Sequence, residues 1–304
     1  MYRTFRIIVL AILLLALLVL VPSPRFVFAE IIEYDLKPGK CIEPYEDCYL
    51  DEWHYEDPSI SVSIEKGRMF DTNYMVARVK IANASQLRTE FTGSFYAPDK
   101  EQGATVARRV NAVLAINGDY YCEEKRMPFG YTCRQGKVYK NKINVYDESR
   151  GFSFDVLIID ENGDFHIERA PSPDYLKNHL PYTPINGFTF GPGIIIDGEV
   201  QTELFNHDFG GDSHFQRMAI AQVGPLEYMC ICCEGPEDQG SAGMTIYQFA
   251  ELCASFEGIQ NCYNLDGGSS TTIVFRGQKV NSPTNPKHRW IPDIIYFATA
   301  YLPD

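Results

Sequence analysis

Residues 263–275 read YNLDGGSSTTIVF, with one carboxylate, two glycines and four hydroxyl side chains ahead of an apolar segment. The pattern predicts a tight loop from Asp266 to Thr272 that leads into a buried strand. Glycine lets the backbone come close to a ligand, and successive N–H groups in such a loop suit an anion. The loop therefore favours hydrolysis of a phosphorylated or otherwise oxygen-rich substrate. The alternative is a loop whose Asp and Ser side chains only satisfy their own backbone.

A second segment places polar residues in the same way. Residues 112–116 (AVLAI) read as a buried strand that runs directly into Asn117, Gly118, Asp119 and a pair of tyrosines. Strand ends with short glycine turns are where α/β-type folds tend to build sites. We therefore expect this turn and the Asp266 loop to contribute to one site.

A third segment, HFQRMAIA at residues 214–221, brings Arg217 to the edge of another apolar run. In this order, AINGDYY (115–121), QRMAIA (216–221) and NLDGGSSTT (264–272) resemble the phosphodiester glycosidase domain family. The resemblance covers residues 59–302. It implies cleavage of a bond between a sugar and a phosphate, a reaction type that the residues alone do not specify.

The resemblance favours Asp266 as the acid/base or nucleophile. Asp119 is a candidate for the second carboxylate, although the family often lacks one at this position. A phosphate monoester is already a good leaving group, which loosens the usual requirement for a pair of carboxylates and favours a mechanism with a single essential Asp. Arg217 would hold phosphate oxygens with its planar guanidinium, although a surface ion pair is the alternative from sequence alone. Asn117 and Asn264 would orient sugar hydroxyls or the loop, and a purely structural turn role competes for each. The other expected substrate-binding residues are Gly118, Gly267, Gly268, Ser269, Ser270 and Thr271.

Two positions depart from the family pattern. Ser269 stands where the family commonly has a third glycine, which narrows the loop and adds a hydroxyl. Asp119 stands where the family often has a second small residue after Asn-Gly. Either change can alter substrate preference, so the identity of the sugar is not carried over.

The strand and helix signals predict an α+β fold, with a mixed, strand-rich sheet core and a few flanking helices in one main domain. The clearest helix is expected at residues 245–256, with a shorter helical segment at 105–113. We expect strands at residues 59–64, 74–81, 152–159, 165–168, 193–196 and 217–222. The predicted organisation is a signal peptide or membrane anchor at 1–29, an acidic Pro/Tyr-rich lead-in at 30–58 and the glycosidase-like domain at 59–304.

Composition and the N-terminus point to a compartment outside the cytoplasm. A formal charge of −13 without a Lys/Arg cluster argues against binding of nucleic acid. Two arginines precede fifteen uninterrupted apolar residues at 7–21, and Val27-Phe28-Ala29 fits a small-residue cleavage site. This run is short for a bilayer span, so we expect a cleaved signal, or else an uncleaved anchor that provides the only membrane contact.

Nine cysteines are many for a cytosolic chain and fit an oxidising compartment. Local spacing favours the pairs Cys41–Cys48, Cys122–Cys133 and Cys253–Cys262. Three cysteines at 230, 232 and 233 remain, and their spacing does not match a zinc site. We predict no metal and no cofactor.

The sequence thus predicts an extracytoplasmic hydrolase of a glycosyl-phosphodiester in a phosphorylated glycan or exopolysaccharide. The substrate glycan is the expected partner. The rival hypothesis is a non-catalytic surface or exopolysaccharide-binding protein with the same fold, and a third is a hydrolase of unrelated phosphodiesters.

Overall fold

A computed structural model describes residues 30–96, 101–120, 129–143, 154–204, 211–283 and 289–303. Residues 31–301 form one compact unit, and the second unit comprises 1–30 and 302–304. The predicted signal or anchor at 1–29 lies outside the described residues. Within the described part of the chain, no helix is both long and apolar enough to cross a membrane.

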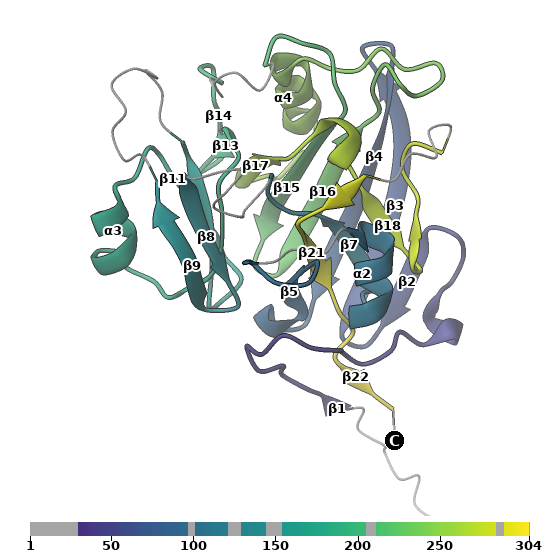
Figure 1. Cartoon of the computed structure of the whole chain (residues 1–304). Helices are drawn as coiled ribbons and strands as arrows, with labels where there is room; N and C mark the ends of the chain where they lie inside the picture. The colour runs from purple at the N-terminus through teal and green to yellow at the C-terminus, as the bar shows by residue number, and fades with distance from the viewer. Residues whose placement is uncertain are drawn as a thin grey trace, which may run out of the picture. The chain divides into compact units, whose positions relative to one another are not determined.

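The compact unit is built on an eight-stranded sheet (Figure 1). Its strands lie in the order β14 (Glu199–Val200), β13 (Gly193–Ile196), β17 (Asn261–Leu265), β15 (Arg217–Gly224), β16 (Glu227–Cys233), β4 (Thr72–Ile81), β3 (Ile60–Met69) and β2 (His54–Asp57). β2 comes from the segment expected as a lead-in and pairs with β3. Residues 31–58 are therefore part of the compact unit.

A second sheet packs against one face of the first. Its order is β19 (Gln278–Lys279), β18 (Ile273–Phe275), β7 (Leu114–Asn117), β21 (Asp293–Phe297) and β5 (Leu87–Phe91). Met218 and Ile220 of β15 share one core with Leu114 and Ile116 of β7. Because side chains alternate along a strand, Ala219 instead faces the opposite side of the first sheet.

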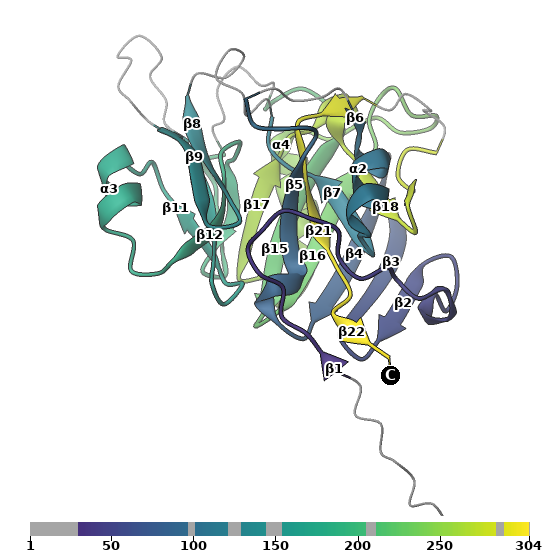
Figure 2. The same ribbon diagram turned by 60° about the horizontal axis from the view of Figure 1, so that its bottom comes forward.

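One helix covers the outer face of each of these two sheets (Figure 2). α4 (Ile246–Ala254) buries Phe249 and Leu252 over the first sheet, and α2 (Gly103–Val110) buries Val106 over the second. α4 begins at a capping box, in which the Thr245 hydroxyl accepts from the Gln248 N–H. The expected helix at 245–256 and helical segment at 105–113 correspond to α4 and α2.

A third sheet lies beside the other two, on the left of Figure 1. Its order is β11 (Phe165–Glu168), β10 (Val156–Asp160), β12 (Pro184–Phe188), β8 (Gly130–Arg134) and β9 (Lys137–Lys142), and α3 (Pro173–Asn178) lies near β9. The remaining elements are β1 (Glu30–Ile31), η1 (Glu46–Cys48), η2 (Ala84–Gln86), β6 (Glu101–Gln102), η3 (Gly268–Ser270), β20 (Trp290–Ile291) and β22 (Tyr301–Leu302). The α+β class is confirmed, and the strands of these three sheets pair in antiparallel fashion among the described residues.

The described cysteines differ from the predicted disulfide framework, because all eight are free thiols. Cys41 lies 3.7 Å from the Tyr296 hydroxyl in the cluster under α2, whereas Cys48 packs against the core between the sheets. The predicted Cys41–Cys48 bridge is therefore absent. Cys253 of α4 and Cys262 of β17 are hydrogen-bonded through their thiols, but no disulfide bond joins them.

Two further cysteine predictions concern other strands. Cys133 is a buried thiol of β8, and its expected partner, Cys122, lies outside the described residues. The cysteines at 230, 232 and 233 are small core residues of the central strand β16. Among the described residues, no group of three or more His, Cys, Asp or Glu side chains could hold a metal ion.

Candidate active site

Asp266 follows the end of β17, and its carboxyl group is buried. The Ser270 hydroxyl and the Gly267 N–H hydrogen-bond to it and lower its pKa, but burial dominates and raises the pKa to about 7. Arg289 also favours the charged form, and Asp119 opposes it. A carboxyl group with a pKa near neutrality can change protonation state under physiological conditions, which is what acid/base chemistry requires.

Asn117 joins the two predicted loops. Its side-chain amide donates to the Asp266 carbonyl at 2.8 Å and accepts from the Thr272 N–H at 3.0 Å. The end of β7 and both ends of the Asp266 loop are therefore held together by one buried side chain. This arrangement gives Asn117 a loop-orienting role, one of the two roles predicted for it.

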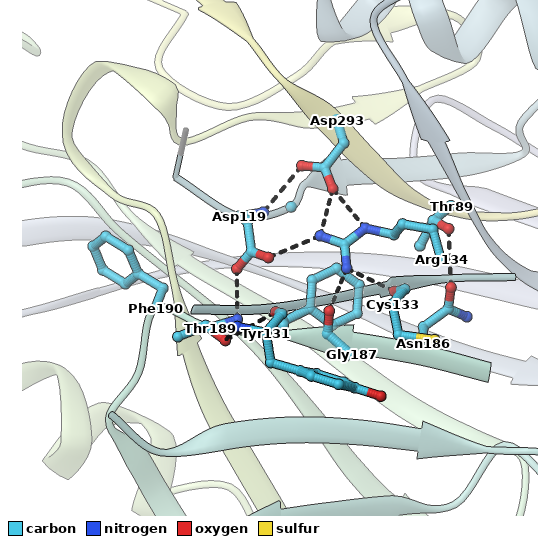
Figure 3. A network of polar contacts seen from close by, with 12 residues as sticks. Thr89, Asp119, Tyr131, Cys133, Arg134, Asn186, Gly187, Thr189, Phe190 and Asp293 are labelled. Atoms are coloured by element: carbon cyan, nitrogen blue, oxygen red, sulfur yellow. Dashed lines mark hydrogen bonds and ion pairs between the residues drawn. The ribbon is translucent and has the colours of Figure 1, made fainter. Parts of the chain in front are cut away.

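Asp119 belongs to a buried cluster of three charges (Figure 3). Arg134, the last residue of β8, lies between Asp119 and Asp293, and its terminal nitrogen is 2.8 Å from Asp119 and 2.6 Å from Asp293. The Arg134 Nε donates to the same Asp293 oxygen at 2.8 Å. The second Asp119 oxygen accepts from the Thr189 N–H at 2.9 Å. The Asp119 carboxylate is thus fixed on both oxygens by groups from a neighbouring sheet.

The three charges influence one another. Burial raises the pKa of Asp119 to about 6, the Arg134 charge works against that rise, and Asp293 adds to it. Burial also raises the pKa of Asp293, again opposed by Arg134. One guanidinium therefore balances two carboxyl groups in an environment that disfavours a second negative charge. The charge of Asp119 also raises the pKa of Asp266, so the two predicted catalytic carboxyl groups are electrostatically coupled.

The predicted glycines have structural reasons to be small. A Cβ at Gly118 would lie 2.5 Å from an Asp293 carboxylate oxygen, so Gly118 allows Asp293 to reach Arg134. A Cβ at Gly267 would lie 2.6 Å from the Gln216 carbonyl of the adjacent strand. Gly268 instead has a φ of +58° with open space around it. The first two glycines are required by packing, and the third is favoured by its backbone conformation.

We expect Gly118→Ala to destabilise the protein by about 1–3 kcal/mol, because the new methyl group must push the Asp293 carboxylate away from Arg134. Urea unfolding measures the change. Gly224→Ala is the matched control, since its Cβ would make only an ordinary 3.8 Å contact and should cost under about 0.5 kcal/mol. Equal effects of the two changes would contradict the assigned role of Gly118.

Arg217 and Asn264 lie beside the loop on neighbouring strands. The Arg217 Nε donates to the Met244 carbonyl at 3.1 Å, and a terminal nitrogen donates to the carbonyls of Gly211 and Ser213 at 3.3 and 2.8 Å. Through these bonds the buried Arg217 side chain holds three main-chain carbonyls in place. Its contact with phosphate stays a prediction. The Asn264 amide donates to the Gly191 carbonyl at 2.7 Å.

Three polar side chains in and beside the loop differ in how they are hydrogen-bonded. The Ser269 hydroxyl contacts Arg289 at 3.4 Å. The Asn264 Oδ1 and the Thr271 Oγ1 are buried, and neither has a hydrogen-bond partner in the part of the chain that the structure describes. Buried polar atoms are normally satisfied, so two such atoms in one candidate site are consistent with a site built for hydrogen-bonding ligands or water.

Sequence reasoning missed Arg134, Asp293, Thr189 and Arg289. Arg134 and Asp293 occupy strand ends, as Asp119 and Asp266 do, but no glycine-rich motif marks them. The signal that could have found them is charge at the boundary of an apolar strand, as in Asp293 before IIYF. The sheet pairing that brings them together is not visible in the sequence.

Together, the strand-rich two-sheet core and the buried carboxyl groups define an α+β protein with a buried acidic candidate site. A model of the phosphodiester glycosidase family matches residues 110–298. This match spans more than half of the chain, and the chain therefore belongs to the phosphodiester glycosidase family.

Individual relatives are distant. The SPbeta prophage-derived uncharacterized protein YomE of Bacillus subtilis (strain 168) is 24% identical over 207 residues, which cover 67% of this chain and 31% of that protein. The chain thus spans about a third of the length of this curated relative.

Solved structures share the fold. The catalytic domain of zebrafish N-acetylglucosamine-1-phosphodiester alpha-N-acetylglucosaminidase, auto-inhibited by its pro-peptide, has a TM-score of 0.60 and 16% identity, covering 85% of this chain and 87% of that chain. A hypothetical protein from Synechocystis has a TM-score of 0.50 and 16% identity, with 78% and 62% covered. At these identities the likeness concerns the fold alone.

Proposed function

We propose that this chain is a glycosidase that hydrolyses a glycosyl-phosphodiester in a phosphorylated glycan or exopolysaccharide. The observation that carries the proposal is the buried Asp266 carboxyl group, which has a pKa of about 7 and lies within electrostatic reach of Asp119. Membership of the phosphodiester glycosidase family supports the type of reaction.

In the proposed reaction, the bond between the anomeric carbon and the phosphate oxygen breaks. Water supplies a hydroxyl group to the anomeric carbon and a proton to the solution, and the products are a free sugar and a phosphate monoester. Positive charge develops on the sugar in the transition state. Ionised Asp266 stabilises that charge, and Asp119, held by Arg134 and Thr189, adds a second fixed carboxylate.

Phosphate recognition has a candidate cation in Arg289. It contacts Ser269 of the loop and lowers the pKa of Asp266, so its positive charge lies near both. The phosphomonoester leaves without a strong general acid because it is already a stable anion. This agrees with an Asp266 that acts in its ionised form.

The test is a product screen of the purified full chain against glycosyl-phosphodiesters in ¹⁸O-labelled water. We expect release of sugar and incorporation of label into the sugar, measured by mass spectrometry. Label in the phosphate would show cleavage of the P–O bond and replace this proposal with an unrelated phosphodiesterase. Binding of the diesters without turnover would favour the non-catalytic glycan-binding protein.

We further propose that the reaction takes place outside the cytoplasm, on the basis of the apolar run at 7–21 and the Val27-Phe28-Ala29 site. The expected mature chain begins near residue 30, or the anchored form exposes its body outside. N-terminal sequencing and protease accessibility on intact cells measure this. A body fully protected within the cytoplasm would contradict it.

A further inference from the structure

A cluster of aromatic rings lies where the second and third sheets meet, beside the candidate active site. β5 and β9 are edge strands of these two sheets, and rings from both meet here. We call the cluster the aromatic platform, and it consists of Phe91 of β5, Phe95 and Tyr96 of the loop after β5, and Tyr139 of β9. Neighbouring ring centroids are 5.0–6.4 Å apart.

The platform has a buried base and an exposed outer ring. Phe95 is 4% exposed, whereas Tyr96 is 76% exposed, the highest value among the large hydrophobic side chains that the structure describes. The two rings meet edge to face with centroids 5.0 Å apart. An aromatic ring that is packed on others at one edge and open to water elsewhere is typical of a surface that a partner covers.

Two lysines of β9 bring positive charge to the platform. The Lys137 ammonium lies 4.7 Å from the centroid of the Tyr139 ring, and the Lys140 ammonium lies 5.9 Å from that of Phe95. Lysines on an edge strand also discourage pairing with another chain, but that role does not require them to lie over rings. In a chain whose net charge is −13, such a local positive region attracts an anionic ligand that the rest of the surface repels.

The platform is continuous with the carboxyl cluster of the candidate site. Phe91 is the register partner of Asp293 in the pairing of β5 with β21. Lys140 is buried, and its charge is among those that oppose the rise that burial causes in the pKa of Asp119. Lys140 is therefore close to both the platform and the carboxyl cluster. A ligand that extends from Asp119 over Lys140 would reach the exposed rings.

We propose that the aromatic platform binds an anionic glycan chain, as the continuation of the substrate beyond the bond that is cleaved. A sugar ring of the chain packs on Tyr96, and a phosphate group between two sugars approaches Lys137. A polymer that alternates apolar ring faces with negative charges matches both kinds of contact, whereas a neutral glycan matches only the rings. The inference rests on the proposed function, because it makes the substrate of the same site a polymer rather than a small diester.

The test is calorimetric titration of the full chain carrying Asp266→Asn, in which bound glycan is not consumed. The probes are a hexamer of glucose units joined by phosphodiesters and glucosyl methyl phosphate, a single diester too short to reach the platform. We expect Tyr96→Ala to raise the Kd of the hexamer about tenfold and Lys137→Met to raise it about threefold. The Kd of the short diester should change less than about twofold.

Two residues outside the platform provide matched controls. Tyr247→Ala on α4 and Lys177→Met on α3 remove side chains of the same kind from other exposed positions, and the Kd of the hexamer should not change. Added salt separates the two contacts, because it screens the Lys137 charge and leaves ring packing in place. If the Asp266→Asn chain does not fold, the unmodified chain is titrated where it is inactive and compared by kcat/KM where it is active.

The outcomes separate this inference from the proposed function. If the unmodified chain hydrolyses diesters but Tyr96→Ala leaves the Kd of the hexamer unchanged, the platform assignment is wrong and the glycosidase proposal stands. If the hexamer binds with the expected losses but no diester is hydrolysed, the platform assignment stands and the glycosidase proposal fails. A hexamer that does not bind at all overturns the platform assignment, whatever the activity.

Discussion

Replacing Asp266 by Asn is expected to lower kcat by about 10³-fold or more while KM changes little. The charge that Asp266 stabilises exists chiefly in the transition state, and a neutral amide of the same shape cannot provide it. Steady-state kinetics with a glycosyl-phosphodiester measures the effect. Asp174→Asn, on the exposed surface of α3, is the control and should leave kcat unchanged.

Asp266→Asn is expected to stabilise the folded protein at neutral and higher pH, although it lowers activity. The folded-state pKa of Asp266 lies above its ordinary value of 3.8, at about 7, so the folded protein binds more protons than the unfolded chain between these values. Stability contributed by this group therefore falls as pH rises from about 4 to about 7. Asp266→Asn should raise the thermal midpoint at pH 8 and have a much smaller effect at pH 4. A variant that unfolds at both pH values would instead show that the Asp266 carboxyl group holds the loop together.

The pH profile provides a third measurement on the same residue. If ionised Asp266 is the working form, kcat/KM of the free enzyme should decline as pH falls below about 7. A profile that rises below pH 7 would assign Asp266 to the protonated, general-acid role. Near-normal turnover of a folded Asp266→Asn variant would remove Asp266 from catalysis altogether.

Replacing Arg134 by Met is expected to destabilise the protein by about 3–5 kcal/mol, since two buried carboxyl groups lose the one cation between them. Activity should be lost with it, because Asp119 is no longer held. Denaturant unfolding measures the change. Lys80→Met removes an exposed pair with Glu227 and should cost only about 0–1 kcal/mol.

A second variant identifies the cause of the Arg134 effect. Combining Arg134→Met with Asp293→Asn removes one uncompensated carboxylate, and we expect it to recover part of the lost stability. No recovery would assign the effect to the Arg134 hydrogen bonds with the carbonyls of Cys133 and Gly187.

The sequence predicted the fold class and the tight loop after Asp266 where local patterns were strong. The strands at 165–168 and 193–196 match β11 and β13, and the capping residue Thr245 marks the start of α4. The cysteine-rich strand β16 was not predicted, because its cysteines were considered only as disulfide partners or thiols, whereas they pack as small core side chains. Local spacing does not reveal which strands become neighbours.

In the candidate site, too, local sequence patterns were informative and long-range strand pairing was not. Asp266 and Asn117 could be found because glycines and hydroxyl groups accompany them. Arg134 and Asp293 could not be found, because their contact forms only when strands 159 positions apart in the sequence come together. The phosphate-binding role of Arg217 was inferred from its planar guanidinium and from the family resemblance. That guanidinium donates to main-chain carbonyls, and its contact with phosphate stays a prediction.

The separation of Arg134 and Asp293 along the chain has a consequence for protein synthesis. Asp119 and Arg134 leave the ribosome together, whereas Asp293 follows 159 residues after Arg134. At about 5–20 residues per second, this interval lasts roughly 10–30 s. During that time the end of β8 carries a cation whose second carboxylate does not yet exist, and β7 lacks the neighbouring strand β21. The nascent chain therefore exposes β7 without its partner strands β18 and β21, beside an Asp119–Arg134 pair that has not yet gained its second carboxylate. This is the stage at which chaperone binding would matter most.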